Sequence, residues 1–276
     1  MAELETPSVT MGDGRAIPQL GFGTFKVPPG DAAAVVSRAL EAGYRHIDTA
    51  AMYGNEAGVG AAIAASGLPR DQIFVTTKLW NDEHHPKQAR VSINASLERL
   101  GLDYVDLYLI HWPAVVKYGD SYIAAWDTLQ EFKSEGLATS IGVSNFNPEH
   151  LDKLHGETPA VDQVELHPSL GQPELCAELR RRGIAIEAWS PLGRGEELSH
   201  SAVVRVAVAI GRTPAQVVIR WHLQKGFIVI PKSVTPARIV ENTRVFDFTL
   251  TPAQMAAIDA LDSGHRTGDD PATAAF

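Results

Sequence analysis

Cysteine, positive charge and long apolar runs are all scarce in this sequence. Cys176 is the single cysteine among 276 residues, so no disulfide can form within the chain. Asp and Glu number 33 against 24 Lys and Arg, which gives a net charge of -9. Nucleic acid and anionic membranes bind clustered cations, so we expect neither as a partner. Gly, Pro or a charge interrupts every stretch that approaches the roughly 18 apolar residues needed to span a bilayer.

The start of the chain lacks the pattern of a secretory signal. Its first five residues, MAELE, are acidic, with no basic segment followed by an apolar one. Because a lone cysteine is also typical of reducing compartments, we expect a cytoplasmic protein. We expect no metal site: His84 and His85 are adjacent, would point to different sides of any regular element, and have no Cys or carboxylate at a metal-ligand spacing.

The composition that is present suits a large folded core. Hydrophobic residues make up 45% and charged residues 21% of the chain, which argues against global disorder. A length of 276 residues fits either two small domains or one α/β barrel. No shift of composition and no linker marks a boundary, so we predict one barrel domain over residues 1–276.

Short apolar runs alternate with helical periodicity along the chain. A glycine-rich turn at 12–14 predicts a hairpin ahead of the main fold. Eight runs are typical of buried strands, at 20–23, 46–49, 73–78, 105–111, 140–143, 161–165, 184–189 and 227–231. Helices are predicted at 31–41, 56–65, 86–100, 122–135, 148–154, 173–182, 201–210, 214–225, 236–245 and 252–261. This alternation predicts an α/β protein, a (β/α)8 TIM barrel with an N-terminal β-hairpin and extra helices. The tail at 263–276 would be a flexible end or a flap over one face.

Four reactive side chains fall where the predicted strands end. Asp48 ends the second strand and Tyr53 follows it, Lys78 ends the third, and His111 ends the fourth. Each alone has a structural explanation, as a helix cap, a loop aromatic, a surface charge or a core histidine. Because active sites of barrels lie at the C-terminal ends of strands, their joint occurrence predicts one shared catalytic site.

These side chains predict proton transfer to a carbonyl. An ammonium at about 4 Å, with an effective dielectric of about 20, would lower the pKa of Tyr53 by roughly three units, toward working pH. Lys78 can supply that charge, Asp48 would keep it charged, and His111 could orient the carbonyl or share the proton. No nucleophile is evident, so a nicotinamide cofactor is the predicted source of hydride.

The cofactor is not expected to use a Rossmann loop. The segment 21–26, GFGTFK, has two glycines of that signature but not the third, and fits the first strand and its loop. The cofactor would lie across the barrel mouth instead. Trp189 could stack on the nicotinamide or pack in the core, and Ser144, Asn145 and Gln163 could hold its amide.

A phosphate site is predicted after the eighth strand. Lys232, Ser233 and Arg238 surround the start of the last barrel helix, where free backbone N–H groups favour anions. Two cations there favour NADPH over NADH, against the alternative that both side chains are simply solvated.

Several strings in this sequence resemble the aldo-keto reductase superfamily. They are HIDTA (46–50), YGNE (53–56), TKLW (77–80), IHWP (110–113), GVSNF (142–146) and IPKS (230–233). The match spans nearly the whole chain, in order. The string AWSPLG at 188–193 is similar to the prokaryotic branch that includes 2,5-diketo-D-gluconate reductases.

The resemblance implies NADPH-dependent reduction of aldehydes and ketones, with Asp48, Tyr53, Lys78 and His111 as the catalytic set and Tyr53 as general acid. The resemblance also implies cofactor contacts at Ser144, Asn145, Gln163, Trp189, Ser190, Leu192, Lys232, Ser233, Arg238 and Asn242. To these we add Gly23 and Thr24, at the end of the first predicted strand. Many members have Tyr where Trp189 stands, which leaves stacking possible with a different geometry. The tail is shorter than in longer relatives, which implies a more open cleft.

The substrate is predicted to be a small carbonyl compound, bound by a monomer. An apolar cleft beside the catalytic set would be lined by Phe22, Phe25, Trp80 and Trp112. Two other functions remain open at this point. One is a cofactor-binding sensor or regulatory subunit on the same barrel, with little turnover. The other is an aldolase with Lys78 as a Schiff base, which needs a neutral lysine and is disfavoured by Asp48.

Overall fold

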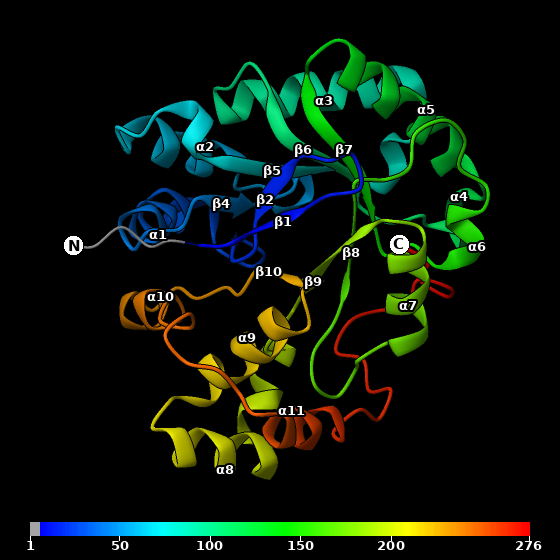
Figure 1. Cartoon of the computed structure of the whole chain (residues 1–276). Helices are drawn as coiled ribbons and strands as arrows, with labels where there is room; N and C mark the ends of the chain where they lie inside the picture. The colour runs from blue at the N-terminus through cyan, green and yellow to red at the C-terminus, as the bar shows by residue number, and fades with distance from the viewer. Residues whose placement is uncertain (1–5) are drawn as a thin grey trace.

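The computed structural model describes residues 6–276, and across them eight parallel strands form a closed barrel (Figure 1). The strands are β3 (Phe22–Gly23), β4 (His46–Asp48), β5 (Phe74–Leu79), β6 (Val105–Ile110), β7 (Ala138–Ser144), β8 (Val161–Glu165), β9 (Ala185–Trp189) and β10 (Ile228–Val229). Each pairs with the next along the chain. A parallel bridge between Leu20 and Val229, and a 2.9 Å hydrogen bond from Gly21 N to Val229 O, join the two edges. The predicted (β/α)8 barrel is confirmed.

Helices surround the strands (Figure 1). They are α1 (Pro29–Glu41), α2 (Glu56–Ala65), α3 (Pro86–Leu100), α4 (Val115–Tyr118), α5 (Ser121–Ser134), α6 (Pro148–Leu151), α7 (Pro173–Arg181), α8 (Ser201–Ile210), α9 (Pro214–Gln224), α10 (Pro236–Glu241) and α11 (Pro252–Asp259). Short 3-10 segments are η1 (Ala51–Tyr53), η2 (Arg70–Gln72), η3 (Asn81–Glu83) and η4 (Gly193–Ser199). The predicted extra helices are present as α8, α9 and α11.

Two helices, α6 and α10, end at least three residues earlier than the periodicity predicts. Helix α10 stops at Glu241 rather than near 245, and the Thr243 hydroxyl donates a 2.8 Å hydrogen bond to the Val240 carbonyl just beyond its end. A side chain that satisfies a backbone carbonyl in this way competes with continued helix. Helix α6 stops at Leu151, and Gly156, with a positive φ of 81°, turns the chain toward β8.

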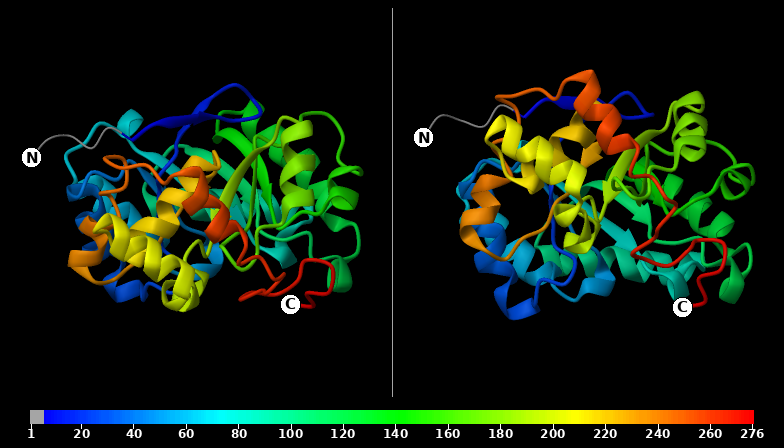
Figure 2. Two further views of the ribbon diagram at one scale, coloured as in Figure 1. Left: turned by 60° about the horizontal axis from the view of Figure 1, so that its bottom comes forward. Right: turned by 90° about the horizontal axis from the view of Figure 1, so that it is seen from below.

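A hairpin closes the N-terminal end of the barrel. Strands β1 (Ser8–Thr10) and β2 (Ala16–Pro18) pair antiparallel, as predicted. Met11 and Ile17 are buried against interior side chains of the barrel, and Gly12 N donates to Ala160 O at 2.9 Å. A Cβ at Gly12 would lie 2.8 Å from a neighbouring carbonyl oxygen, so this close approach needs glycine. The hairpin and the C-terminal tail lie at opposite ends of the molecule (Figure 2).

Side chains of the strands alternate between two apolar regions. In β6, Leu107 and Leu109 face the barrel interior, while Tyr108 and Ile110 pack in the layer between strands and helices. The same period places apolar partners such as Ile47 and Ile186 in the outer layer. It therefore leaves polar side chains of the neighbouring strands inside the barrel, namely His46, Asp48, Lys78, Gln163 and Glu187.

The C-terminal tail crosses the opposite end of the barrel and is a flap, the second of the two predicted alternatives (Figure 2). Its backbone is anchored where Thr267 N donates to Glu165 Oε1 at 2.7 Å. No single helix within residues 6–276 is long and apolar enough to cross a membrane; α8 and α9 meet that test only when taken together as a bent pair. The first five residues, where the sequence has no signal pattern, lie outside the described part of the chain.

Candidate active site

A buried ion pair lies at the C-terminal end of β4 and β5. Lys78 Nζ is 2.8 Å and 2.7 Å from the two carboxylate oxygens of Asp48, and it also donates to Thr49 O at 2.8 Å. Lys78 is fully buried. Burial acts to lower the pKa of Lys78, but the Asp48 carboxylate, with Tyr53 and Glu187, outweighs it, so that the pKa is raised. The lysine is therefore charged at neutral pH.

The Tyr53 hydroxyl lies beside this charge, 3.5 Å from Lys78 Nζ. From the sequence we expect Lys78 to bring the pKa of Tyr53 toward working pH, and this expectation is wrong. Burial is the largest influence and raises the pKa of Tyr53 to about 12, although Lys78 acts in the opposite direction. The phenol therefore keeps its proton at neutral pH, and the nearby charge can stabilise the phenolate only once that proton leaves.

His111 completes the group at the end of β6. Its ring packs edge-on against Tyr53, with centroids 5.7 Å apart, and against Trp80 at 5.0 Å. Burial and the charge of Lys78 hold its pKa well below the ordinary value. His111 is thus a neutral imidazole, with one N–H to donate and one nitrogen to accept.

These groups meet at the floor of a cavity with a volume of about 940 Å³. Asp48, Tyr53 and His111 line it, while Lys78 lies beneath them outside the lining. The structure therefore brings the four predicted catalytic side chains together.

One side of the cavity is aromatic. Phe25, Trp80 and Trp112 all line it, and Phe276 from the tail stacks on Trp80 with ring planes 7° apart and contacts Trp112 edge-on. Asn81 Nδ2 donates to Phe276 O at 3.2 Å, which fixes the end of the tail over this region. The tail narrows a cleft that the sequence predicts to be more open.

Polar side chains from β7 to β9 form a second wall. Trp189 Nε1 donates to Asn145 Oδ1 at 2.8 Å, and Asn145 Nδ2 donates to His111 O at 3.0 Å. Ser144 Oγ donates to Gln163 O at 2.7 Å. Trp189 is only partly buried and lines the cavity, so it is available for stacking as well as packing.

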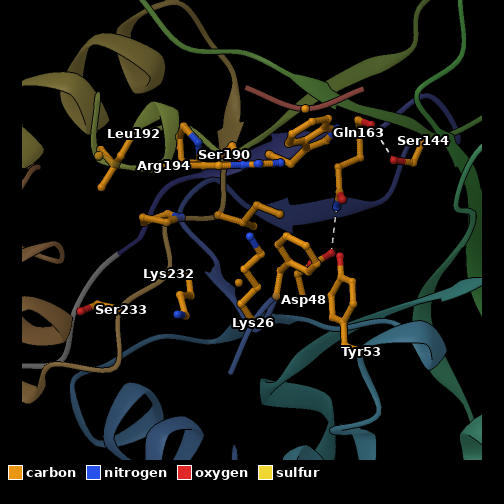
Figure 3. Close-up of a pocket in the computed structure, with 18 of the residues that line it drawn as sticks. Lys26, Asp48, Tyr53, Ser144, Gln163, Ser190, Leu192, Arg194, Lys232 and Ser233 are labelled. Carbon is orange, nitrogen blue, oxygen red and sulfur yellow. Dashed lines mark hydrogen bonds between the residues drawn. The ribbon is translucent and has the colours of Figure 1, made fainter. Parts of the chain in front are cut away.

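Cations lie at the far end of the cavity, away from Tyr53 and Asp48 (Figure 3). Lys232 and Ser233 lie on this side of the view, and Lys26 and Arg238 also line the cavity. Burial and the neighbouring charge of Lys26 lower the pKa of Lys232, as expected where two ammonium groups approach one another without an anion between them.

A buried acceptor lies in the same region. Asn242 Oδ1 is buried, and no donor within residues 6–276 reaches it. Because Asn242 also lines the cavity, this acceptor is available to a ligand N–H. A ligand that carries a phosphate and a hydrogen-bonding ring would match both features.

Comparison with known proteins identifies the family. A sequence model described as Aldo/keto reductase family matches residues 19–263. This chain belongs to the aldo/keto reductase family. It is 51% identical over 271 residues to a protein of Yersinia pestis named methylglyoxal reductase DkgA, covering 96% of each chain. It is 53% identical to an aldo-keto reductase of Mycolicibacterium vanbaalenii, covering 97% of this chain and 96% of the relative.

Solved structures of other family members have the same fold. A point mutant of Gox0644 in complex with NADPH superposes with a TM-score of 0.94 at 43% identity, covering 98% of this chain and 99% of the other. A Bombyx mori aldo-keto reductase in complex with NADP has a TM-score of 0.89 at 38% identity, covering 96% and 95%. The branch suggested by the string at 188–193 agrees with the Yersinia pestis relative.

Most residues predicted to contact cofactor or substrate line the cavity of this aldo/keto reductase. Two do not. Phe22 is buried in the outer core, with its ring 5.3 Å from that of Tyr44. Thr24 is also buried, and its hydroxyl donates to Asp48 O at 2.9 Å, which holds the end of β4. Gly23 does line the cavity, and a Cβ there would lie 2.9 Å from Ile230 O.

Other lining residues are absent from the sequence-based predictions. They include Lys26, Met52, Arg194, Leu198, Thr213, Glu241 and Phe276. Lys26 and Arg194 stand in glycine-containing loops directly after predicted strands, and that position is a signal that could have identified them. Phe276 comes from the tail, and no local pattern indicates which part of the barrel a tail will cover.

Proposed function

We propose that this protein reduces aldehydes or ketones to alcohols with NADPH, and that Tyr53 is the general acid. The observation that carries the proposal is a protonated phenol 3.5 Å from a buried, charged lysine at the floor of a ligand-sized cavity. Family membership supports the same reaction class. When bound, the nicotinamide would supply the hydride that the carbonyl carbon accepts.

Tyr53 donates its proton to the carbonyl oxygen in this mechanism. With a pKa of about 12 it is fully protonated beforehand. The phenolate that forms lies beside Lys78 Nζ, and attraction on the order of 4 kcal/mol at this range lowers the barrier to proton loss. The lysine acts only in the charged state, which its pairing with Asp48 maintains.

His111 would orient the carbonyl. It lines the cavity next to Tyr53, and as a neutral imidazole it can donate one hydrogen bond to the carbonyl oxygen. This role differs from proton donation, because a neutral imidazole N–H is a weaker acid than the phenol. The charged state of Lys78 also argues against a Schiff-base aldolase, which needs a neutral amine.

The cofactor would lie between the two ends of the cavity. The nicotinamide half would be held by Trp189, Asn145, Ser144 and Gln163. The adenosine phosphate half would be held by Lys232, Ser233, Arg238 and Asn242. The unpaired Asn242 Oδ1 and the facing ammonium groups fit such a ligand. Several cations at that end favour the additional phosphate of NADPH.

Small dicarbonyls and aldehydes are the substrates we propose to test first. The relative from Yersinia pestis is named a methylglyoxal reductase, and the aromatic side chains of Trp80, Trp112 and Phe276 line the cavity. A panel of methylglyoxal, other aldehydes, diketones and keto sugars, with loss of NADPH or NADH absorbance as the readout, would rank them.

The decisive experiment compares wild type with Tyr53→Phe. We expect the variant to lose reduction while NADPH still binds, because only the acidic hydroxyl is removed. Tyr104→Phe, the same change at a tyrosine outside the cavity, is the matched control and should keep full activity. Retained turnover in Tyr53→Phe would exclude it as the acid. Tight NADPH binding by wild type without turnover of any carbonyl would favour the sensor function instead.

A further inference from the structure

A carboxyl group without an assigned role lies inside the barrel beneath the cavity. Glu187, in the middle of β9, is fully buried. Its strand neighbours Ile186 and Ala188 pack in the outer layer, so its own side chain faces the interior. It does not line the cavity. A buried carboxyl is costly, so its contacts are informative.

Glu187 and Asp48 together bind one amide nitrogen. Gln163 Nε2 donates to Asp48 Oδ2 at 2.8 Å (Figure 3) and to Glu187 Oε2 at 2.9 Å. An amide nitrogen has two hydrogens, and both are used. If the amide were turned over, its oxygen would face the Asp48 carboxylate, which has no hydrogen to donate, and its N–H groups would lose the acceptors that Asp48 and Glu187 supply. The two contacts together therefore favour one orientation.

In this orientation the amide oxygen of Gln163 is the part of the side chain that remains free to bind a ligand. Gln163 lines the cavity, and within residues 6–276 no donor reaches its Oε1. A free carbonyl oxygen there can accept a hydrogen bond from a ligand N–H, but it cannot donate one.

Glu187 can hold the amide without adding a second negative charge. Burial, followed by the charge of Asp48, raises the pKa of Glu187 to about 8. His46 Nε2 lies 3.5 Å from Glu187 Oε1, and burial lowers the pKa of His46 to about 3. Burial therefore favours the neutral form of both groups, and a protonated carboxyl still accepts through its other oxygen. Asp48 and Lys78 remain the charged pair above them.

We propose that Glu187 is a positioning residue that turns the Gln163 amide oxygen toward the cavity and so makes the site selective for a ligand with an amide N–H at this position. The inference rests on the proposed function, because the ligand group concerned is the carboxamide of the nicotinamide. Glu187 touches neither cofactor nor substrate; it acts through Gln163.

The test uses binding rather than turnover. NADP⁺ and its analogue with an acetyl group in place of the carboxamide differ in the N–H that Gln163 would accept. Titration of protein fluorescence measures both Kd values. For wild type we expect the analogue to bind about tenfold more weakly, which is the effect of one hydrogen bond lost in a buried site.

Three variants separate positioning from general damage. Glu187→Gln keeps an acceptor oxygen and should keep the ratio of Kd values. Glu187→Leu removes the acceptor, and its ratio should fall toward one. Thr76→Val alters another interior contact of His46, whose Nε2 is 3.3 Å from Thr76 Oγ1, and as matched control should keep the ratio. Circular dichroism would confirm folding, and Glu187→Met, with a more adaptable side chain, replaces Glu187→Leu if that variant does not fold.

The outcomes are distinct. A ratio near one in Glu187→Leu or Glu187→Met alone supports the inference. An unchanged ratio in a folded variant overturns it, as does a wild type that binds both ligands equally, although the proposed function would then still stand. A wild type that binds neither ligand overturns both.

Discussion

Lys78 Nζ lies 2.7 Å from Asp48 Oδ2, and the two side chains are 0% and 3% exposed. A pair this deeply buried costs desolvation energy for both ions, so its persistence beside Tyr53 is more easily explained by chemistry than by stability. The pair keeps a positive charge next to a phenol that burial alone would make a very weak acid. Lys78 depends on the Asp48 carboxylate for its charged state.

Removal of the carboxylate should therefore damage both stability and activity. In Asp48→Asn the buried ammonium loses its counterion, and we expect the free energy of unfolding to fall by about 3–5 kcal/mol, measured by urea denaturation. We expect kcat to fall at least about a hundredfold, because the pKa of Lys78 drops and less charge faces Tyr53. The control is the double variant with Lys78→Met, which should recover part of the stability but no activity. If Asp48→Asn alone were as stable as wild type, the buried charge of Lys78 would not depend on Asp48.

A second prediction concerns alkaline pH and the anchor of the tail. His167 Nε2 lies 3.1 Å from Glu165 Oε1, and His167 Nδ1 lies 2.7 Å from Glu197 Oε1. Burial acts to lower the pKa of His167, but its contacts with the two glutamates outweigh it and raise the pKa from 6.5 to about 9. Glu165 also accepts from the backbone N–H groups of Thr267 and Gly268, so the protonated histidine links η4 to the tail.

Because the folded pKa is the raised one, protonation of His167 stabilises the fold. The contribution is fully present below about pH 6.5 and is lost as pH rises through about 9. The shift corresponds to at most about 3 kcal/mol. We expect the Tm of wild type, minus that of His167→Gln, to decrease between pH 7 and pH 10. This difference in Tm cancels the effects of all other titrating groups, because both proteins contain them. A difference that does not change with pH would show that the histidine is neutral in the fold.

The proposed catalytic side chains were accessible from sequence for a physical reason. Asp48, Lys78 and His111 each end an apolar run, and in a parallel barrel those ends share one rim. The order of residues along the chain is therefore enough to identify these side chains and to predict that they lie close together. The sign of the Tyr53 pKa shift does not, because a sequence shows which charges are near a strand end but not how much water they lose.

Interior and tail contacts were not accessible in the same way. Glu187 stands out as an acid inside an apolar run, yet its partners Gln163 and His46 come from strands far away in the sequence. Phe22 shows the converse error: it is adjacent to glycines at the predicted mouth, but the alternation of β3 directs it into the outer layer. The contact of Phe276 with Trp80 depends on the path of the whole tail.

Cofactor selectivity gives a third prediction. Arg238 and Lys232 both line the cavity, and we propose that they bind the additional phosphate of NADPH. We expect Arg238→Ala to weaken NADPH binding about tenfold and NADH binding by less than about twofold, since only the former carries that phosphate. Arg205→Ala, at an exposed arginine of α8, is the control and should change neither Kd. Equal loss of both cofactors would place Arg238 elsewhere on the ligand.

The contact between the tail and Trp189 gives a fourth prediction, which needs only one added methyl group. A Cβ at Gly268 would lie 2.4 Å from Trp189 Cη2, too close for either to stay in place. Gly268→Ala should therefore lift the tail from Trp189 and expose more of the indole. We expect the KM for carbonyl substrates to rise several-fold. The Kd of the protein for the adenosine half of the cofactor, measured as a separate fragment, should change little. Trp fluorescence and hydrogen exchange in the tail would detect the movement. Gly30→Ala, in the first turn of α1 with open space around its Cβ, is the matched control. If Gly268→Ala keeps wild-type KM and tail protection, the indole must have room to yield, and the tail does not set the width of the substrate cleft.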